Sequence, residues 1–369
     1  MSNNTTPPFY LKISQITIGL IGFFYVMYIG QDIIIPLIYA TILAILLNPF
    51  VNFLCKHRFN RVIAILIAVL FAFIVVAALI YFISAQAARF SETMPQLKEK
   101  FGLMFKDLTT WIAHTFNVSN SKVNHWIDDT KGQGMENSSA VIGATISTIG
   151  GVLAMIFLIP VYIFMILFYK SLLLEFISRL FKKDKHATVA EVLMETKALI
   201  QNYLVGLLVE TAIVAALNAA GLLILGIQYA LLLGLIGALL NLIPYIGGIV
   251  AIALPMIIAI ATKSPEYAIY VFLVYILVQF IDNNFLVPKI VASKVKINAL
   301  VSIVVVLVGG ALWGIPGMFL SIPLTAIVKV MCDRIEQLKP WGFLLGDTMP
   351  SFVNFKFPKA KKKVEKVVE

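Results

Sequence analysis

Three stretches of this chain carry no charged residue, and they restrict the possible folds more than any other feature. Residues 62–88, 137–169 and 297–328 contain no Asp, Glu, Lys or Arg. Across the whole chain 60% of the residues are hydrophobic and 13% are charged, about half the charged share of an ordinary soluble domain. A helix that crosses a bilayer needs roughly 20 predominantly apolar residues, and several segments reach that length. We therefore expect an all-α polytopic membrane protein.

We expect about eight apolar segments, two of which differ from ordinary spanning helices. The segments are residues 13–30, 33–54, 62–84, 140–169, 204–226, 231–261, 266–282 and 298–331. Those at 231–261 and 298–331 exceed the length of one span, and glycine and proline interrupt both. Because proline lacks a backbone donor and clashes with the preceding helical turn, each interruption predicts a break in the helix.

Basic residues predict the orientation of these segments. They gather in three short links and in the C-terminal tail: Lys56, Arg58 and Arg61; Lys170, Arg179, Lys182, Lys183 and Lys185; Lys289, Lys294 and Lys296; and Lys356, Lys359, Lys361, Lys362, Lys363 and Lys366. Lys and Arg collect in cytoplasmic loops, so we expect all four groups and both termini in the cytoplasm. The same distribution accounts for the net charge of +10 without a nucleic-acid partner.

The orientation divides the chain into six expected parts. They are N-terminal transmembrane helices (1–84), a small helical extracytoplasmic subdomain (85–138), a transmembrane helix (139–170), an amphipathic cytoplasmic link (171–200), a transport core (201–333) and a basic cytoplasmic tail (334–369).

The transport core is expected to contain two re-entrant hairpins of opposite orientation. Segment 266–282 must run inward because three lysines follow it, so its start lies outside, as does the link at 226–230. Segment 231–261 then begins and ends on one face. Segment 298–331 lies between two basic regions and begins and ends on the other. Inverted broken hairpins are typical of secondary transporters. Two long, kinked spans are the alternative.

The two breaks are the predicted substrate or ion gates. Broken backbone is tolerated at membrane depth only inside protein or beside a water-filled cavity. The alternative is a pair of packing kinks, in which glycine lets helices approach closely. The gate residues are Asn241, Pro244, Tyr245, Gly247 and Gly248 in the first break, and Gly309, Gly310, Gly314, Pro316 and Gly317 in the second.

Four further residues are candidates for coupling transport to an ion. Gln279, Asp282 and Asn284 close segment 266–282, and Gln279 and Asp282 are neighbours on one helix face. Such a group could coordinate Na⁺ or carry a proton, or could cap the helix at the membrane boundary. Glu210 lies just inside segment 204–226, where a carboxylate is costly and marks a functional site. It could instead reach water or pair with Lys197.

Signatures of enzymes are missing from the sequence. The four histidines are scattered, no Cys–His metal spacing occurs, and neither a Walker-type loop nor a GxSxG motif is present. We expect no catalytic residue, metal or cofactor, and we expect transport to be driven by a gradient, with H⁺ or Na⁺ as the coupling ion.

Several motifs resemble those of the AI-2E family, the autoinducer-2 exporter-like or PerM-type permeases of bacteria. They are Asn241-Leu-Ile-Pro-Tyr-Ile-Gly-Gly; Gln279, Asp282 and Asn284 before Val287-Pro-Lys-Ile; Gly309-Gly-Ala-Leu-Trp-Gly-Ile-Pro-Gly-Met; Ser321-Ile-Pro-Leu; and, as a weaker signal, Leu47-Asn-Pro. The order and spacing are similar over about residues 190–332. The chain departs from the family pattern at Leu207, where relatives often have Gln, and in carrying Glu210.

The resemblance implies an inner-membrane transporter that forms homo-oligomers, with a gating or coupling role for Asp282. Members of the family are linked to export of autoinducer-2 or to Na⁺(Li⁺)/H⁺ exchange. We therefore expect a secondary transporter that exports a small polar solute across a lipid bilayer. A cation/proton antiporter is the first alternative, and a membrane scaffold that presents residues 85–138 to partners is the second.

Overall fold

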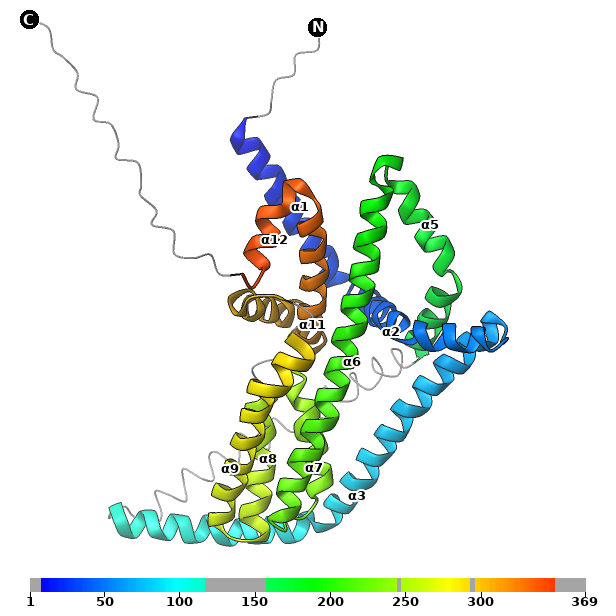
Figure 1. Ribbon diagram of the computed structural model, residues 1–369. Coiled ribbons are helices and arrows are strands. Elements are labelled where there is room, and N and C mark those ends of the chain that lie inside the picture. Colours follow the sequence, from blue (N-terminus) through cyan, green and yellow to red (C-terminus); the bar gives the residue numbers. More distant parts are fainter. Residues whose placement is uncertain (1–7, 117–156, 244–246, 293–295, 349–369) are drawn as a thin grey trace, which may run out of the picture.

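The computed structural model describes residues 8–116, 157–243, 247–292 and 296–348. Every regular element in these ranges is a helix, and the one isolated bridge joins Ile297 to Gly346. The helices, shown in Figure 1, are α1 (Phe9–Ile29), α2 (Gln31–Lys56), α3 (Arg61–Phe116), α5 (Lys170–Leu180), η1 (Lys183–Lys185), α6 (His186–Ile224), α7 (Ala230–Asn241), α8 (Gly247–Thr262), α9 (Pro265–Ile281), η2 (Asp282–Ala292), α11 (Ala299–Arg334), η3 (Glu336–Leu338) and α12 (Lys339–Leu345). A further helix, Phe157–Phe168, precedes α5.

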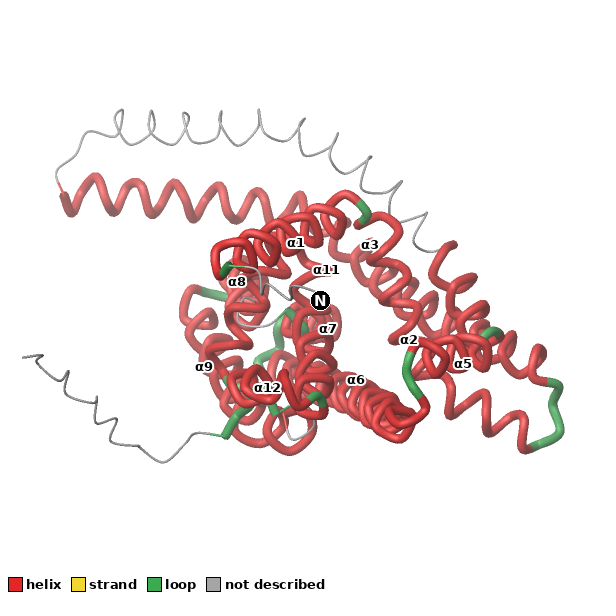
Figure 2. Tube along the Cα trace, turned by 90° about the horizontal axis from the view of Figure 1, so that it is seen from above, coloured by secondary structure: helices red, strands yellow, loops and turns green. Residues whose placement is uncertain are grey.

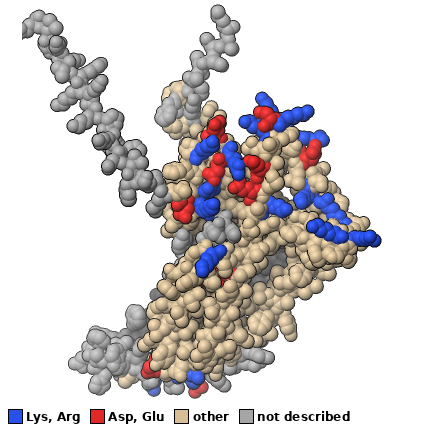
Figure 3. Space-filling view, viewed as in Figure 1, with Lys and Arg blue, Asp and Glu red and all other residues tan. Residues whose placement is uncertain are grey.

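Length and composition suit these helices to a bilayer. Within the described ranges five helices are long and apolar enough to cross one, and the bent pair of Phe157–Phe168 and α5 is a sixth candidate. Figure 3 shows charged side chains gathered at the upper end of the molecule and a few at its lower tip, with a broad band between them that is almost uncharged. The prediction of an all-α polytopic membrane protein is confirmed.

Two predicted domain boundaries fall inside continuous helices. Helix α3 passes from the apolar segment at 62–84 into the polar region without interruption, and α6 begins at His186, well before the predicted end of the link at residue 200. A helix can change polarity along its length while its backbone hydrogen bonding continues, and no proline interrupts α6. The predicted subdomain beyond residue 116 lies outside the described residues.

The first break separates two short helices that form a hairpin. Helices α7 and α8 meet at their tip, where Gly247 packs against the backbone of Leu240 and Asn241. Figure 1 shows both helices beside α9 and the C-terminal part of α6, with their open ends at the bottom of the view. Their 12 and 16 residues correspond to about 18 and 24 Å, less than the roughly 30 Å of a bilayer core. We call this pair of helices the first hairpin.

The second break folds α11 back on itself at Gly314. That glycine has φ 64° and ψ −144°, a combination that residues with a side chain rarely adopt. The arms touch on either side of it, because the backbones of Gly309 and Gly317 are in direct contact. Asn298, just before the first arm, binds Leu345 and Gly346 of the segment that follows the second arm. Both arms therefore return to one region, and we call α11 the second hairpin.

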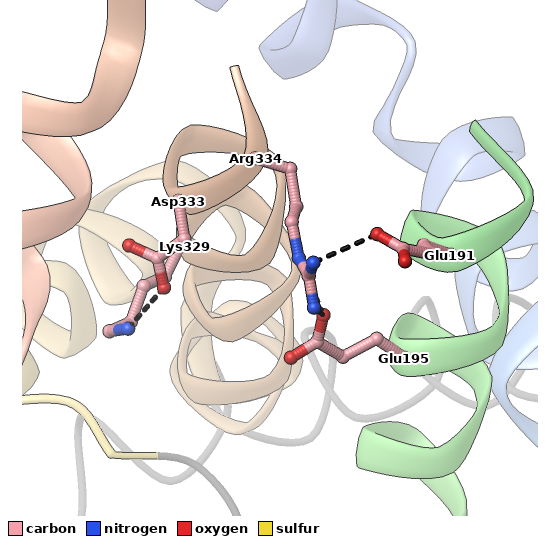
Figure 4. A network of polar contacts seen from close by, with 5 residues as sticks. All are labelled: Glu191, Glu195, Lys329, Asp333 and Arg334. Carbon is pink, nitrogen blue, oxygen red and sulfur yellow. Dashed lines mark hydrogen bonds and ion pairs between the residues drawn. The ribbon is translucent and has the colours of Figure 1, made fainter. Parts of the chain in front are cut away.

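The two hairpins open toward opposite ends of α6. The first hairpin packs on the C-terminal half, with Gly234 against Ala219. At the end of the second hairpin, Arg334 forms ion pairs with Glu191 and Glu195 near the N-terminus of α6, at 2.8 and 3.0 Å (Figure 4). This arrangement fits the predicted inverted pair. Their entry into a membrane from opposite faces stays a prediction.

Helix α6 joins the two hairpins to the N-terminal helices. It packs against α7, α9, η2, α11 and α2. Viewed from above, α7, α9 and α12 lie on one side of α6, and α2 and α5 lie on the other, whereas the long α3 crosses from one side to the other and contacts α7 and α8 (Figure 2). Helix α6 therefore contacts both hairpins as well as α2 of the N-terminal helices.

Candidate functional site

Two buried carboxyl groups and an amide meet at the tip of the first hairpin. Glu210 of α6 is 7% exposed, and Asp282, the first residue of η2, is 1% exposed. Asn241, the last residue of α7, donates from Nδ2 to Asp282 Oδ2 at 2.9 Å. The Glu210 carboxyl lies within hydrogen-bonding reach of the Asp282 carboxyl. Three of the residues expected to form gates or coordinate ions thus form one cluster, which we call the carboxyl cluster.

Each member of the carboxyl cluster is placed by the local structure of its own element. Glu210 lies on the inward face of α6, in register with the buried residues Tyr203 and Val214. Asn241 stands where the first arm of the hairpin ends. Asp282 stands where α9 gives way to a π-helix, a wider turn that often accompanies functional sites.

The carboxyl cluster has too few donors for two ionised carboxylates. Asp282 Oδ1 has no hydrogen-bond partner among the described residues. Ionised carboxylates only accept hydrogen bonds, so Glu210 and Asp282 cannot satisfy one another unless a proton or a cation lies between them. Two like charges in a site shielded from water also repel strongly. One proton or one cation between the two carboxyl groups would satisfy both of them.

Gln279 and Gly248 border the carboxyl cluster, whereas Asn284 does not. A methyl group placed on Gly248 would lie 3.0 Å from Gln279 Oε1 and 3.5 Å from Asn241 Oδ1. Gln279 Nε2 donates to Asn283 Oδ1 at 3.4 Å. The exposed Asn284 turns back on its own helix and donates to the Phe280 carbonyl at 2.9 Å. Gln279 thus lies beside Gly248 at the edge of the cluster, whereas the described bond of Asn284 is to the preceding helical turn.

The tip of the second hairpin is held by the N-terminal helices. The hydroxyl of Tyr39 in α2 donates to the Pro316 carbonyl at 3.3 Å, and Trp313 Nε1 donates to the Met27 carbonyl of α1 at 2.9 Å. The predicted gate residues Gly309, Gly310, Gly314 and Gly317 lie at or beside this tip, where Gly310 contacts Met318. The contacts described for these glycines are with other residues of the second hairpin and not with the carboxyl cluster. The predicted gate residues Pro244 and Tyr245 lie outside the described residues.

A cavity of about 520 Å³ lies between α2, α6 and η2. Its lining is Leu46, Pro49, Gln201, Asn202, Val205, Gly206, Val209, Lys289 and Ile290. This volume is typical of a small-molecule site, and the lining combines apolar walls with two amides and an ammonium group. Val209 and Gly206 place the cavity within about one turn of Glu210 along α6. The sequence alone did not predict this cavity, because the cavity forms only where α2 packs beside α6.

Sequence reasoning also missed one buried polar residue near the carboxyl cluster. Tyr275 of α9 is 6% exposed and lies about two turns before Asp282 on the same face. The spacing of seven residues to Asp282 is the signal that could have identified it.

Sequence comparison with known proteins shows the family to which the chain belongs. The model of the AI-2E family transporter matches residues 18–337. The AI-2 transport protein TqsA of Escherichia coli (strain K12) is 26% identical over 322 residues, which cover 86% of this chain and 90% of TqsA. A Bacillus subtilis (strain 168) protein named "Putative transport protein YueF" is 28% identical over 320 residues, 82% of this chain and 84% of its own length. These relatives are transport proteins, not enzymes. The chain belongs to the AI-2E family of membrane transporters.

Proposed function

We propose that this transporter is a gradient-driven exporter of a small polar solute, and that the carboxyl cluster couples the flow of an ion to movement of the first hairpin. The contact of two buried carboxyl groups with Asn241 at the hairpin tip carries the proposal. Ionisable groups inside membrane helices are costly and commonly mark ion pathways. Two buried carboxyl groups are costly in a core that only holds the fold together, whereas a transporter can use them to bind and release a cation or proton.

Asn241 gives the coupling ion a way to move the hairpin. Its amide donates to an ionised Asp282, so the hairpin tip is held by a hydrogen bond to a charge. When Asp282 takes up a proton, that bond loses its charge assistance and the tip is held less strongly. Occupancy of the cluster therefore shifts the hairpin between two positions, which is what alternating access requires.

The cavity between α2, α6 and η2 is the proposed solute site. The amide groups of Gln201 and Asn202 suit a polar, uncharged ligand, and Gln201 is already fixed by its bond to the Ile45 carbonyl at 2.7 Å. The relative named AI-2 transport protein TqsA supports a small polar solute of the autoinducer-2 type. On this proposal the protein lies in the bacterial inner membrane with both termini in the cytoplasm.

A Na⁺(Li⁺)/H⁺ antiporter is the second candidate, and the carboxyl pair itself favours it. Two neighbouring carboxylates can hold one alkali cation or one proton in turn, without any organic solute. This alternative uses Glu210 and Asp282 in the same roles and leaves the cavity without a function.

Flux through proteoliposomes tests the proposal and separates the two candidates. Glu210→Gln and Asp282→Asn should each lower coupled flux at least tenfold. Glu336→Gln, which removes an exposed carboxylate after the second hairpin, is the matched control and should leave flux unchanged. Solute efflux that requires the carboxyl pair supports the exporter. Proton movement that depends on Na⁺ or Li⁺, with no efflux across a panel of polar solutes, supports the antiporter. Normal flux in both carboxyl variants would refute both candidates.

A further inference from the structure

A second polar level lies beyond the carboxyl cluster, toward the open end of the first hairpin. Asn218 of α6 is 2% exposed and Tyr275 of α9 is 6% exposed. Asn218 Oδ1 and Tyr275 Oη have no hydrogen-bond partner among the described residues. Buried polar atoms are nearly always paired with protein or with ordered water, so two unpaired oxygens in one region call for a ligand.

The two side chains converge on one glycine of the first hairpin. A methyl group placed on Gly237 of α7 would lie 2.9 Å from Tyr275 Oη and 3.4 Å from Asn218 Nδ2. Gly237 therefore lies beside both polar groups, and the absence of a side chain there lets the Tyr275 hydroxyl approach α7 closely. We call Asn218, Tyr275 and Gly237 the second polar level.

The second polar level repeats the construction of the carboxyl cluster on the same three helices. Helices α6 and α7 each contribute one residue to each level, and α9 with the η2 helix that continues it contributes Tyr275 and Asp282. The paired positions are eight, four and seven residues apart. At 1.5 Å per residue, the levels are separated by about 12 Å along α6, about 6 Å along α7 and about 10 Å from α9 into η2. All three helices place the second polar level on the same side of the carboxyl cluster, since α6 runs toward the open end of the first hairpin while α7 and α9 run away from it.

One apolar layer separates the two levels. Val214 of α6, Ala238 of α7 and Val278 of α9 are all buried and pack together as a cluster. Each lies between its helix's two polar positions. A ring of apolar side chains blocks ions and chains of water molecules by excluding water, which is a recognised way of gating a membrane pathway.

We propose that the second polar level binds a water molecule and that Val214, Ala238 and Val278 form a hydrophobic gate between this water and the carboxyl cluster. The water donates to Asn218 Oδ1 and accepts from the Tyr275 hydroxyl. A coupling proton or cation enters from the open end of the first hairpin, waits at this level and passes the gate to reach Glu210 and Asp282. This inference rests on the proposed function of the carboxyl cluster.

The first hairpin controls the gate because α7 carries both Ala238 and Asn241. When Asn241 is released from Asp282, movement of α7 withdraws Ala238 from Val214 and Val278. Hydration of the gate is then tied to the state of the carboxyl cluster. The bound ion thereby opens or closes its own route.

Cysteine labelling tests the water site independently of transport. In a background with Cys55→Ser and Cys332→Ser, single cysteines replace Asn218, Val214 and the lipid-facing Leu208, which is 60% exposed. A charged methanethiosulfonate reagent needs water at its target, so Asn218→Cys should react at least tenfold faster than Val214→Cys or Leu208→Cys. Adding Val278→Thr to Val214→Cys should raise its rate toward that of Asn218→Cys. Equal, slow labelling of Asn218→Cys and Leu208→Cys would overturn the proposal.

Flux measurements supply a second test that does not alter Asn218. Tyr275→Phe should slow coupled proton or cation flux at least fivefold, because the water loses its donor. Val278→Thr should add an uncoupled leak. Tyr270→Phe, which removes a hydroxyl from an exposed position on the same helix, is the control and should change nothing. Tyr275→Phe at the wild-type rate would contradict the water site. If wild-type protein shows no flux while Asn218→Cys still labels fast, the proposed function fails and the water site stands.

Discussion

Removal of the Asn241 side chain tests how firmly the carboxyl cluster holds the first hairpin. The amide donates to Asp282 at 2.9 Å, and hydrogen bonds to charged groups contribute about 1.5–3 kcal/mol. Each 1.4 kcal/mol changes an equilibrium tenfold, so Asn241→Ala should raise the open fraction of the hairpin about 10- to 150-fold. The bond joins the last residue of α7 to η2, and its loss frees the tip without creating a large cavity.

Hydrogen exchange measured by mass spectrometry reports this opening. The amides of Leu242 and Ile243 donate to the carbonyls of Leu239 and Leu240 directly beside Asn241, so their protection depends on the closed tip. Their protection factors should fall by the same 10- to 150-fold in Asn241→Ala.

A matched control removes an equivalent amide bond elsewhere. Asn284→Ala deletes a hydrogen bond of the same 2.9 Å length, but to a neutral carbonyl and at an exposed position. It should leave the protection of the hairpin tip unchanged. Equal protection of the tip in Asn241→Ala and Asn284→Ala would refute the view that Asp282 holds the hairpin.

Three further predictions concern the second hairpin. Arg334→Ala removes both ion pairs to α6. Because these side chains are 41–55% exposed, the melting temperature in detergent should fall only slightly at low salt and should match that of the wild type at about 1 M salt. Gly317→Ala places a methyl group against the Gly309 backbone, so this variant should yield no monodisperse protein in size-exclusion chromatography. Gly19→Ala is the control: its added methyl group meets no atom within 4 Å, and the variant should be recovered normally. Gly314→Ala should destabilise the protein by about 1–3 kcal/mol through backbone strain, and an unchanged melting temperature would contradict the fold at this residue.

The helical architecture was predictable because hydrophobic length and loop charge are local properties of a sequence. Both hairpins followed from the same reasoning, since Gly314 and the Asn241–Gly248 break interrupt otherwise apolar runs. The extents of α3 and α6 were not predictable from polarity, because a helix that leaves the membrane does not have to end there.

The carboxyl cluster was predictable residue by residue but not as a group. Asp282, Asn241 and Glu210 each stood out as polar groups in apolar surroundings. Their contact depends on how α6, α7 and η2 pack, which no single segment encodes. Asn284 was grouped with Asp282 by its proximity in sequence, but two residues along a helix point to different sides.

Contacts between distant segments account for the other differences. Trp313 and Pro316 are bound by Met27 and Tyr39, which lie more than 270 positions away in sequence. The tip of the second hairpin therefore meets the N-terminal helices, a contact that sequence spacing alone could not indicate. Tyr275 was not identified from the sequence, because its burial beside Asn218 and Gly237 depends on how α6, α7 and α9 pack together.

An exchange of the two carboxyl side chains tests the central claim most directly. Glu210→Asp lengthens the gap between the two carboxyl groups by one methylene and Asp282→Glu shortens it, so each single variant should lose coupled flux at least tenfold. The double variant restores the total length with the two acids exchanged. If Glu210 and Asp282 share one bound proton or cation, the double variant should regain at least half of the wild-type flux in proteoliposomes. A double variant that is no more active than either single variant, or single variants that transport normally, would contradict the account.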